Sequence, residues 1–107
     1  FVHYDVTICK PDDPITYVFR SFKLHSELYF ILVDPSNEVL STNTFSGEHH
    51  WWIEGTVMPI AWKRRWDKGR IFYCSIGHLL DDLKHPSVTE IMRRGMLWAA
   101  GANINYK

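Results

Sequence analysis

The segment Ile60–Ile76, IAWKRRWDKGRIFYCSI, decides the fold that we expect for this chain. Its two arms, Ile60–Trp66 and Arg70–Ile76, are rich in the aromatic and β-branched residues that favour strands. Between them stands Asp67-Lys68-Gly69, a short polar stretch that ends in glycine. Glycine adopts a positive φ without steric cost, and tight hairpin turns need a residue that does so. The segment therefore predicts an antiparallel β-hairpin with Gly69 supplying the positive φ.

Three further runs upstream of the hairpin also predict strands. Phe1–Cys9 alternates apolar and polar residues, so its apolar side chains fall on one face of a strand. Lys23–Val33 and Glu38–Thr44 are strand-like as well. Prolines and aspartates in Lys10–Pro14 and the turn residues of Asp34–Asn37 interrupt these runs, since proline cannot continue a ladder and these residues favour turns.

The last predicted element is a helix that starts near Pro86. Ser87-Val-Thr-Glu90 fits a capping box, and a proline just ahead suits the same helix start. Gly95 lowers the helix propensity at mid-helix, so we expect another element to pack closely there, and Gly101 closes the helix. Apolar residues recur at helical spacing and form the stripe that faces the core: Val88, Ile91, Met92, Gly95, Leu97, Trp98 and Ala99.

The expected pattern is about five strands followed by one helix, with hairpins and no βαβ alternation. One helix covers only one face of a sheet, so the pattern predicts a partner segment for the other face. The chain has 107 residues and starts at Phe1 rather than Met, and we expect it to be a fragment of a longer protein.

Composition excludes several classes of protein. Hydrophobic residues make up 46% and aromatic residues 15%, which is too apolar for a disordered segment. Twelve basic residues balance twelve acidic ones, so there is no basic footprint for nucleic acid or for an anionic membrane. No apolar stretch is long enough to span a bilayer. The two cysteines, Cys9 and Cys74, have no C-x-x-C spacing and favour a cytoplasmic location, with a chance disulfide left open.

A family resemblance covers most of the chain. The stretches MPIAWKRRWDKGRIFYCSIGH over Met58–His78 and MRRGMLWAAG over Met92–Gly101 resemble the C-terminal half of the ThuA-like (trehalose utilisation) family. Upstream, the spacing of Phe22 to Glu27-Leu-Tyr29 and the segment Asp12-Asp-Pro-Ile-Thr16 resemble family motifs in the same order. Two positions depart from the family pattern, because Asp13 stands where the family has His, and Ser26 where it has an acidic residue.

The resemblance implies a fold and a domain organisation. The ThuA-like family is similar to the class I glutamine amidotransferases, which implies an α/β, flavodoxin-like, three-layer domain. Residues 1–107 would be the C-terminal part of that domain, mostly strands and hairpins with one C-terminal helix. The N-terminal half of the domain would be the missing partner segment, and assembly into a homo-oligomer is open.

Glu27 and His78 are the candidate catalytic residues. Glu27 lies in an apolar strand, where a carboxylate is either exposed at an edge or buried with a partner, and a solvent-facing role remains the alternative. His78 follows Gly77 at the end of a strand, the end at which α/β proteins place ligand groups, or else it simply bonds the following loop. The resemblance implies that both act on the substrate, with Tyr29 and Gly77 as ligand-binding positions.

His25 and Trp51 are weaker candidates. His25 and Glu27 lie two residues apart on one face of a strand, and with His78 they would supply a ligand set for Zn²⁺ or another divalent metal. A surface histidine is the alternative. Trp51, in the expected loop Phe45–Thr56, would stack on a sugar ring, or else would close the core.

The sequence contains no G-x-S-x-G elbow, no P-loop and no dinucleotide-binding glycine motif. The basic run at Lys63, Arg64 and Arg65 is interpreted as a solvated hairpin face. The resemblance implies hydrolase- or lyase-like chemistry on a sugar derivative in carbohydrate metabolism, with the isolated fragment inactive. The alternatives are a non-catalytic sugar-binding or assembly module, or a degenerate ThuA-like paralogue.

Overall fold

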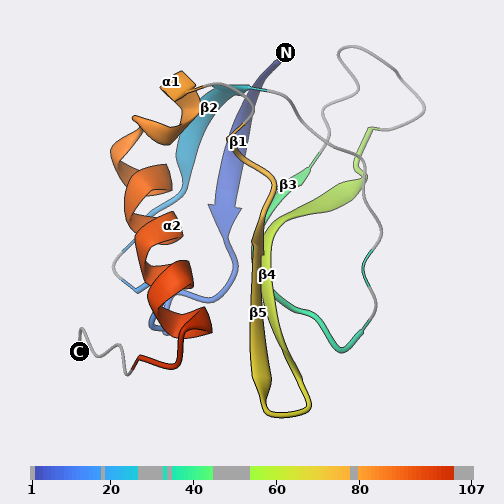
Figure 1. The fold of residues 1–107 in the computed structure, drawn as a ribbon. Helices are drawn as coiled ribbons and strands as arrows, with labels where there is room; N and C mark the ends of the chain where they lie inside the picture. The colour runs from blue at the N-terminus through green and yellow to red at the C-terminus, as the bar shows by residue number, and fades with distance from the viewer. Residues whose placement is uncertain are drawn as a thin grey trace.

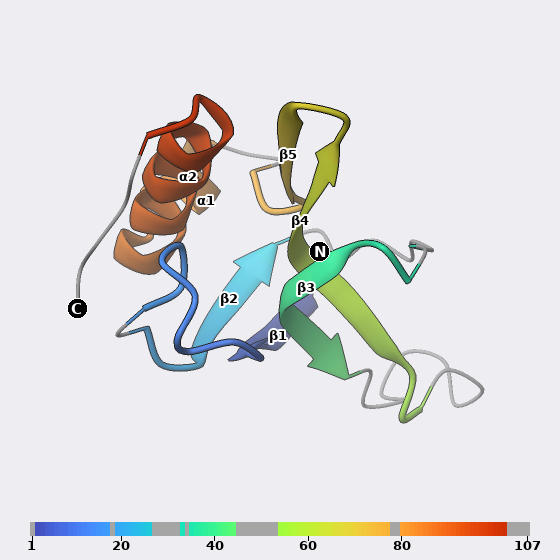
Figure 2. The same cartoon turned by 90° about the horizontal axis from the view of Figure 1, so that it is seen from below.

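The computed structural model describes residues 2–17, 19–26, 33, 35–44, 54–77 and 80–102. Five strands form one sheet in the order β2-β1-β3-β4-β5, and every neighbouring pair is antiparallel. Figure 2 shows that this sheet is strongly curled. The elements, in chain order, are β1 (Val2–Ile8), β2 (Phe22–Ser26), β3 (Glu38–Thr44), β4 (Val57–Trp66), β5 (Gly69–Cys74), α1 (Leu80–Leu83) and α2 (Pro86–Ala99).

The predicted hairpin is confirmed as the pairing of β4 with β5. Its register runs from Ala61 opposite Cys74 to Trp66 opposite Gly69, and its tip projects from the body of the molecule (Figure 1). The prediction that Gly69 supplies the positive φ is wrong. Asp67 has that conformation, with φ 53°. Aspartate tolerates the left-handed region because its short polar side chain can bond to the local backbone. The loop consists of only two residues, Asp67 and Lys68, because Gly69 already belongs to β5.

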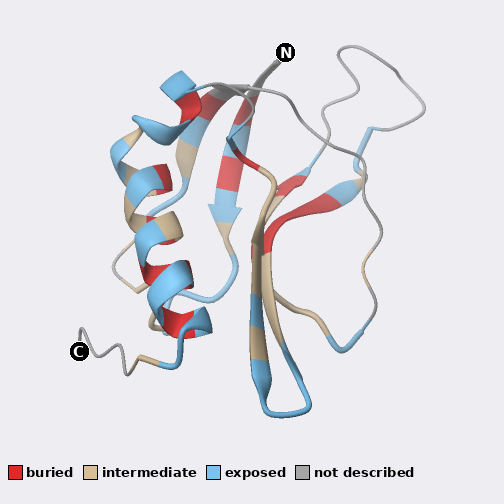
Figure 3. Cartoon of the chain, viewed as in Figure 1, coloured by how far each residue is buried: buried red, intermediate tan, exposed pale blue. Residues whose placement is uncertain are grey.

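The strand that opens the chain also follows the prediction. Tyr4 and Val6 are buried, whereas Asp5 and Thr7 between them are exposed. Tyr4 and Val6 pack in one buried cluster with Val88 of α2, and Figure 3 shows buried stretches on both the strands and the helix. Strand β1 therefore contributes alternate residues to the core, whereas β4 buries the four consecutive residues Met58–Ala61. Within the core, one cluster comprises Tyr4, Val6, Leu24, Ile60, Ile76 and Val88, and a second comprises Ile15, Leu40, Ile91 and Trp98.

Helix α2 starts at Pro86 as predicted, but the capping box is wrong. The N-cap residue is His85, whose Nδ1 accepts a hydrogen bond from the backbone N of Ser87 at 3.2 Å. Ser87 thus lies inside the first turn, and Glu90 does not take part in the cap. The Glu90 carboxylate accepts hydrogen bonds from the guanidinium groups of Arg93 and Arg94. A cap at His85 and a cap at Ser87 both suit a helix that starts near Pro86, so the local sequence does not distinguish between them.

The buried stripe of α2 differs from the predicted one. Arg94 is buried, whereas Leu97 and Ala99 are exposed. Arg94 is satisfied by polar partners, because its Nη1 donates to the carbonyl of Tyr17 at 2.8 Å. Helix α2 ends at Ala99, and Gly101 follows the C-cap residue Ala100 as the predicted closing glycine, with φ 90°.

Gly95 confirms the expected close approach of another element. A Cβ atom at this position would lie 2.3 Å from Cε2 of Phe72 in β5. The aromatic ring of the hairpin therefore occupies the space that a side chain on the helix would need.

The structure is a mixed α/β arrangement with a curled antiparallel sheet and a C-terminal helix, as far as the described residues show. The short helix α1, which contacts β2 and α2, adds to the single helix predicted. A flavodoxin-like domain has parallel strands, and none of the described strand pairs is parallel. None of the described helices is long and apolar enough to cross a membrane.

Candidate functional site

Most of the predicted site residues lie outside the described part of the chain. Glu27, Tyr29, Trp51 and His78 are outside it altogether. His25 is described only through its backbone, which pairs with His3 across β2 and β1. The roles predicted for these residues, including the metal site, therefore stay predictions.

The described backbone brings together the two segments that lead to Glu27 and His78. Strand β2 ends at Ser26, directly before Glu27, and the segment after β5 ends at Gly77, directly before His78. Leu24 and Ile76, which lie three and two residues before the two candidates, belong to the same buried cluster. Figure 1 shows both segments running toward the end of the molecule at which α1 lies.

Gly77 is the one predicted site residue whose geometry is fully described. Its φ is 135°, a region that residues with a Cβ rarely adopt, and a Cβ would lie 3.3 Å from Cδ2 of Leu83. A backbone requirement therefore explains this glycine, and the same unusual conformation sets the direction in which the chain enters His78.

A buried group of ionisable side chains, which the sequence did not reveal, lies at the same end. Asp82 of α1 is only 4% exposed although it is a carboxylate in a four-residue helix. Burial, and then the charges of Asp82 and Cys74, raise the pKa of the Tyr4 hydroxyl. Burial also raises the pKa of the Cys74 thiol. Tyr4 and Cys74 therefore stay protonated at neutral pH, and both can act as hydrogen-bond donors near the candidate site.

Sequence reasoning missed Asp82 because nothing in its spacing distinguishes it from its neighbour. Asp81 and Asp82 are adjacent in the same short helix, yet Asp81 is exposed and Asp82 is buried. Tyr4 was recognised only as a core residue on the apolar face of β1. A buried carboxylate beside a buried phenol is the type of environment in which functional groups are tuned.

A second polar cluster joins the start of the chain to the hairpin. Lys63 forms an ion pair with Asp13, and its Nζ lies 3.5 Å from Oε2 of Glu38. Lys10 Nζ lies 3.1 Å from the other oxygen, Oε1, of Glu38. Burial alone would raise the pKa of Glu38, but the hydrogen bond from Lys10 and the charge of Lys63 outweigh it and hold the pKa below its usual value.

This cluster corrects the interpretation of the basic run as a solvated face for Lys63, whereas Arg65 is exposed as predicted. The side chain of Lys63 is only 13% exposed, and that of its partner Asp13 is 7% exposed. The backbone N of Ile15 donates to Oδ1 of Asp13 at 3.0 Å, which fixes the carboxylate that Lys63 meets. Asp13 is one of the two departures from the family pattern, and here it serves as the anchor of an ion pair.

A groove of about 370 Å³ lies beside this cluster. Its described lining is mostly charged and comprises Ser36, Glu38, Lys63, Arg64, Arg65 and Trp98. The lining comes from β3 and the residues just before it, from β4 and from the last turn of α2. The segments that lead to Glu27 and His78 run instead toward α1 (Figure 1).

Among the described residues, no three His, Cys, Asp or Glu side chains gather into a metal-binding group. The three ligands predicted for a metal, His25, Glu27 and His78, are the ones whose side chains the structure does not describe.

Comparison with known proteins decides the family. A family model described as ThuA, trehalose utilisation, matches residues 1–99. The chain belongs to the ThuA family. No significant match was found among curated proteins or among solved structures. The ThuA match confirms the resemblance drawn from Met58–His78 and from Met92–Gly101, apart from the last two residues of the latter stretch, and it includes Glu27 and His78.

Proposed function

We propose that this ThuA domain acts on a sugar derivative in carbohydrate metabolism. The observation that carries the proposal is the match of a trehalose utilisation family to residues 1–99. Two features of the structure support the position of the site. Leu24 and Ile76 bring the segments before Glu27 and His78 into one core cluster, and Gly77 has a backbone conformation that other residues rarely adopt.

In this proposal, Glu27 and His78 exchange protons with the substrate in hydrolase- or lyase-like chemistry. A carboxylate and an imidazole are the groups that proteins most often use as general bases and acids near neutral pH. Tyr29 and Trp51 bind the sugar, since aromatic rings present apolar faces to sugar C–H groups. Alternatively, His25, Glu27 and His78 would hold a divalent metal such as Zn²⁺, which would activate water, and Glu27 and His78 would then act as ligands rather than as acid and base.

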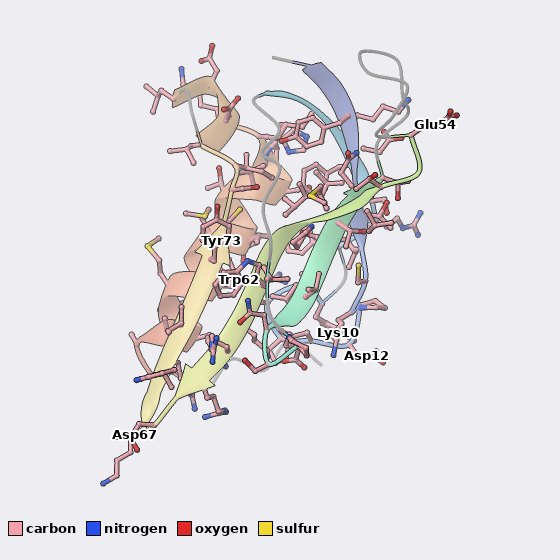
Figure 4. All side chains as sticks on the ribbon, turned by 90° about the vertical axis from the view of Figure 1, so that its right-hand side faces the viewer. Lys10, Asp12, Glu54, Trp62, Asp67 and Tyr73 are labelled. Atoms are coloured by element: carbon pink, nitrogen blue, oxygen red, sulfur yellow. The ribbon has the colours of Figure 1, made fainter. Side chains whose placement is uncertain are left out.

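We also propose that the chain functions as the C-terminal part of a larger flavodoxin-like, class I glutamine amidotransferase-like domain. The N-terminal half of that domain would complete the site, and the assembled protein would form a homo-oligomer. Both described helices lie on the same side of the sheet, and the opposite face of the hairpin carries the stacked pair Trp62 and Tyr73 (Figure 4). A cytoplasmic location is part of the proposal, and the free thiols of Cys9 and Cys74 support it.

The test compares charge-neutral variants that keep side-chain size. Glu27→Gln and His78→Asn are made in the chain itself and in the chain joined to the N-terminal half encoded upstream. Turnover of trehalose and of oxidised or phosphorylated derivatives is followed by NMR. Asp67→Asn is the matched control, because Asp67 is exposed at the hairpin tip (Figure 4) and asparagine tolerates the same backbone conformation.

The proposal expects turnover only in the joined protein, with a loss of about 10²-fold or more for Glu27→Gln and His78→Asn and none for Asp67→Asn. Turnover that survives both substitutions would exclude these two residues as the catalytic pair. Sugar binding without turnover in any form would instead favour the alternative, a non-catalytic binding module. Metal content measured on the dialysed protein, with and without His25→Ala, tests the zinc site separately.

A further inference from the structure

Positive charge is concentrated on the hairpin that borders the groove. Residues 63–70 carry five cationic side chains and one carboxylate, in a chain whose net charge is zero. Three of these cations, from Lys63, Arg65 and Arg70, lie on the face of the hairpin that packs toward the end of α2.

All three cations lie near the indole ring of Trp98. Lys63 Nζ lies 5.0 Å from the centroid of the Trp98 ring, and the guanidinium carbons of Arg65 and Arg70 lie at 5.9 Å and 5.3 Å. Arg65 and Arg70 are also directly opposite each other across β4 and β5. Like charges in opposite positions of a sheet destabilise it, so this arrangement has an energetic cost unless a counter-charge is present.

The carboxylates nearby are already engaged by other partners. Asp13 pairs with Lys63, and each oxygen of Glu38 is held by a lysine, Oε1 by Lys10 and Oε2 by Lys63. Within the described part of the chain, neither Arg65 nor Arg70 has an ion-pair partner.

The helix end offsets only part of the charge. Arg70 donates from Nη1 to the carbonyl of Trp98 at 3.1 Å, and the partial negative charge at the C-terminus of α2 favours cations there. Arg65 makes no such hydrogen bond among the described residues and is exposed, so its guanidinium is available to a molecule in the groove.

We propose that this groove binds a small oxyanion, a phosphate or carboxylate group on an organic molecule, with Arg65 as its main contact. Guanidinium groups form paired hydrogen bonds with phosphate and carboxylate, and the volume of about 370 Å³ suits a molecule of the size of a monosaccharide phosphate. Ser36 and Arg64 supply further polar groups in the lining. The described lining contains none of the residues that the proposed function uses, so the two proposals are tested independently.

The experiment titrates the intact chain with inorganic phosphate by NMR, and then with glucose 6-phosphate, glucuronate and glucose. Phosphate and glucose 6-phosphate should bind if the site prefers phosphate, and glucuronate should bind if a carboxylate suffices. Glucose, which has no anionic group, should not bind. Arg65→Gln is the test variant. Lys68→Gln is the matched control, because it removes the same charge from the exposed tip of the same hairpin.

The proposal expects Arg65→Gln to weaken binding about tenfold and Lys68→Gln to weaken it less than twofold, with Arg65→Lys intermediate. Equal losses in Arg65→Gln and Lys68→Gln would overturn it, since they would show only a general effect of charge. Absence of binding to all the anionic probes would overturn it as well. A third outcome against the proposal is that Arg65→Gln lowers the melting temperature but leaves the affinity for phosphate unchanged. That result would show that Arg65 only stabilises the end of α2.

Discussion

The contact between Gly95 of α2 and Phe72 of β5 predicts that Gly95→Ala destabilises the protein, against the usual rule for helices. In a solvent-exposed helix, replacing glycine by alanine stabilises the protein by about 1 kcal/mol, because the chain with alanine loses less conformational entropy on folding. At position 95 the new methyl group would lie 2.3, 2.4 and 2.6 Å from three carbons of the Phe72 ring. These distances are shorter than van der Waals contact, so the ring or the helix must move.

The size of the effect follows from these two opposing terms. Phe72 packs against the cluster that contains Ile91 and Trp98, so its ring has little room to yield. Overpacking of a well-filled core costs about 1–3 kcal/mol. After the gain of about 1 kcal/mol from helix propensity, we expect a net loss of up to about 2 kcal/mol in the free energy of unfolding. For a domain of this size, each 1 kcal/mol of that loss lowers the melting temperature by roughly 4–8 °C.

The assay is urea unfolding, followed by circular dichroism, of the four proteins in a double-mutant cycle. These are the wild type, Gly95→Ala, Phe72→Leu and the double variant, with Met96→Ala as a control because Met96 is on the same helix and 61% exposed. In the Phe72→Leu background, the cost of Gly95→Ala should fall by at least about 1 kcal/mol, because the ring atoms that clash are gone. A stabilising Gly95→Ala in the wild type would refute the packing argument. An unchanged cost in Phe72→Leu would show that the strain lies elsewhere.

Two further predictions concern α2. The hydrogen bond from Arg93, followed by that from Arg94, lowers the pKa of Glu90 from 4.5 to about 2, although burial acts in the opposite direction. Because the folded-state pKa is below the unfolded one, the stabilisation by Glu90 is complete above about pH 4.5 and disappears as the pH falls toward about 2. The difference in melting temperature between wild type and Glu90→Gln should therefore shrink over that range, and a constant difference would contradict the ion-pair assignment. The second prediction is that His85→Ala costs about 1 kcal/mol, whereas His85→Asp costs less, since Asp can still accept the hydrogen bond from the Ser87 amide. Equal losses in the two variants, measured by urea unfolding, would show that the stabilisation by His85 does not come from its hydrogen bond to the Ser87 amide.

Only part of the candidate site could be predicted from the sequence. The motif around Gly77 marked a special backbone position, and its φ of 135° gives the physical reason. Asp82 and Tyr4 had no such mark, because their proximity depends on the packing of α1 near β1 rather than on spacing along the chain. The charge cluster was missed for the same reason. Asp13 and Lys63 are fifty residues apart in sequence, and only the folded chain reveals that they form an ion pair.

The sequence by itself determined the opening strand, the presence of the hairpin, the glycine that follows the helix and the family, whereas the predicted hairpin pairing was one residue out of register. The correctly predicted features depend on local preferences: alternation of side chains, the conformational freedom of glycine, and motifs carried by contiguous residues. The tertiary structure alone decided which residue caps α2, which residue of the hairpin loop takes the positive φ, and where the charge of Lys63 is neutralised. Each of these depends on competition between groups that meet only after folding, and the energies of the competing arrangements differ by amounts that the local sequence does not encode.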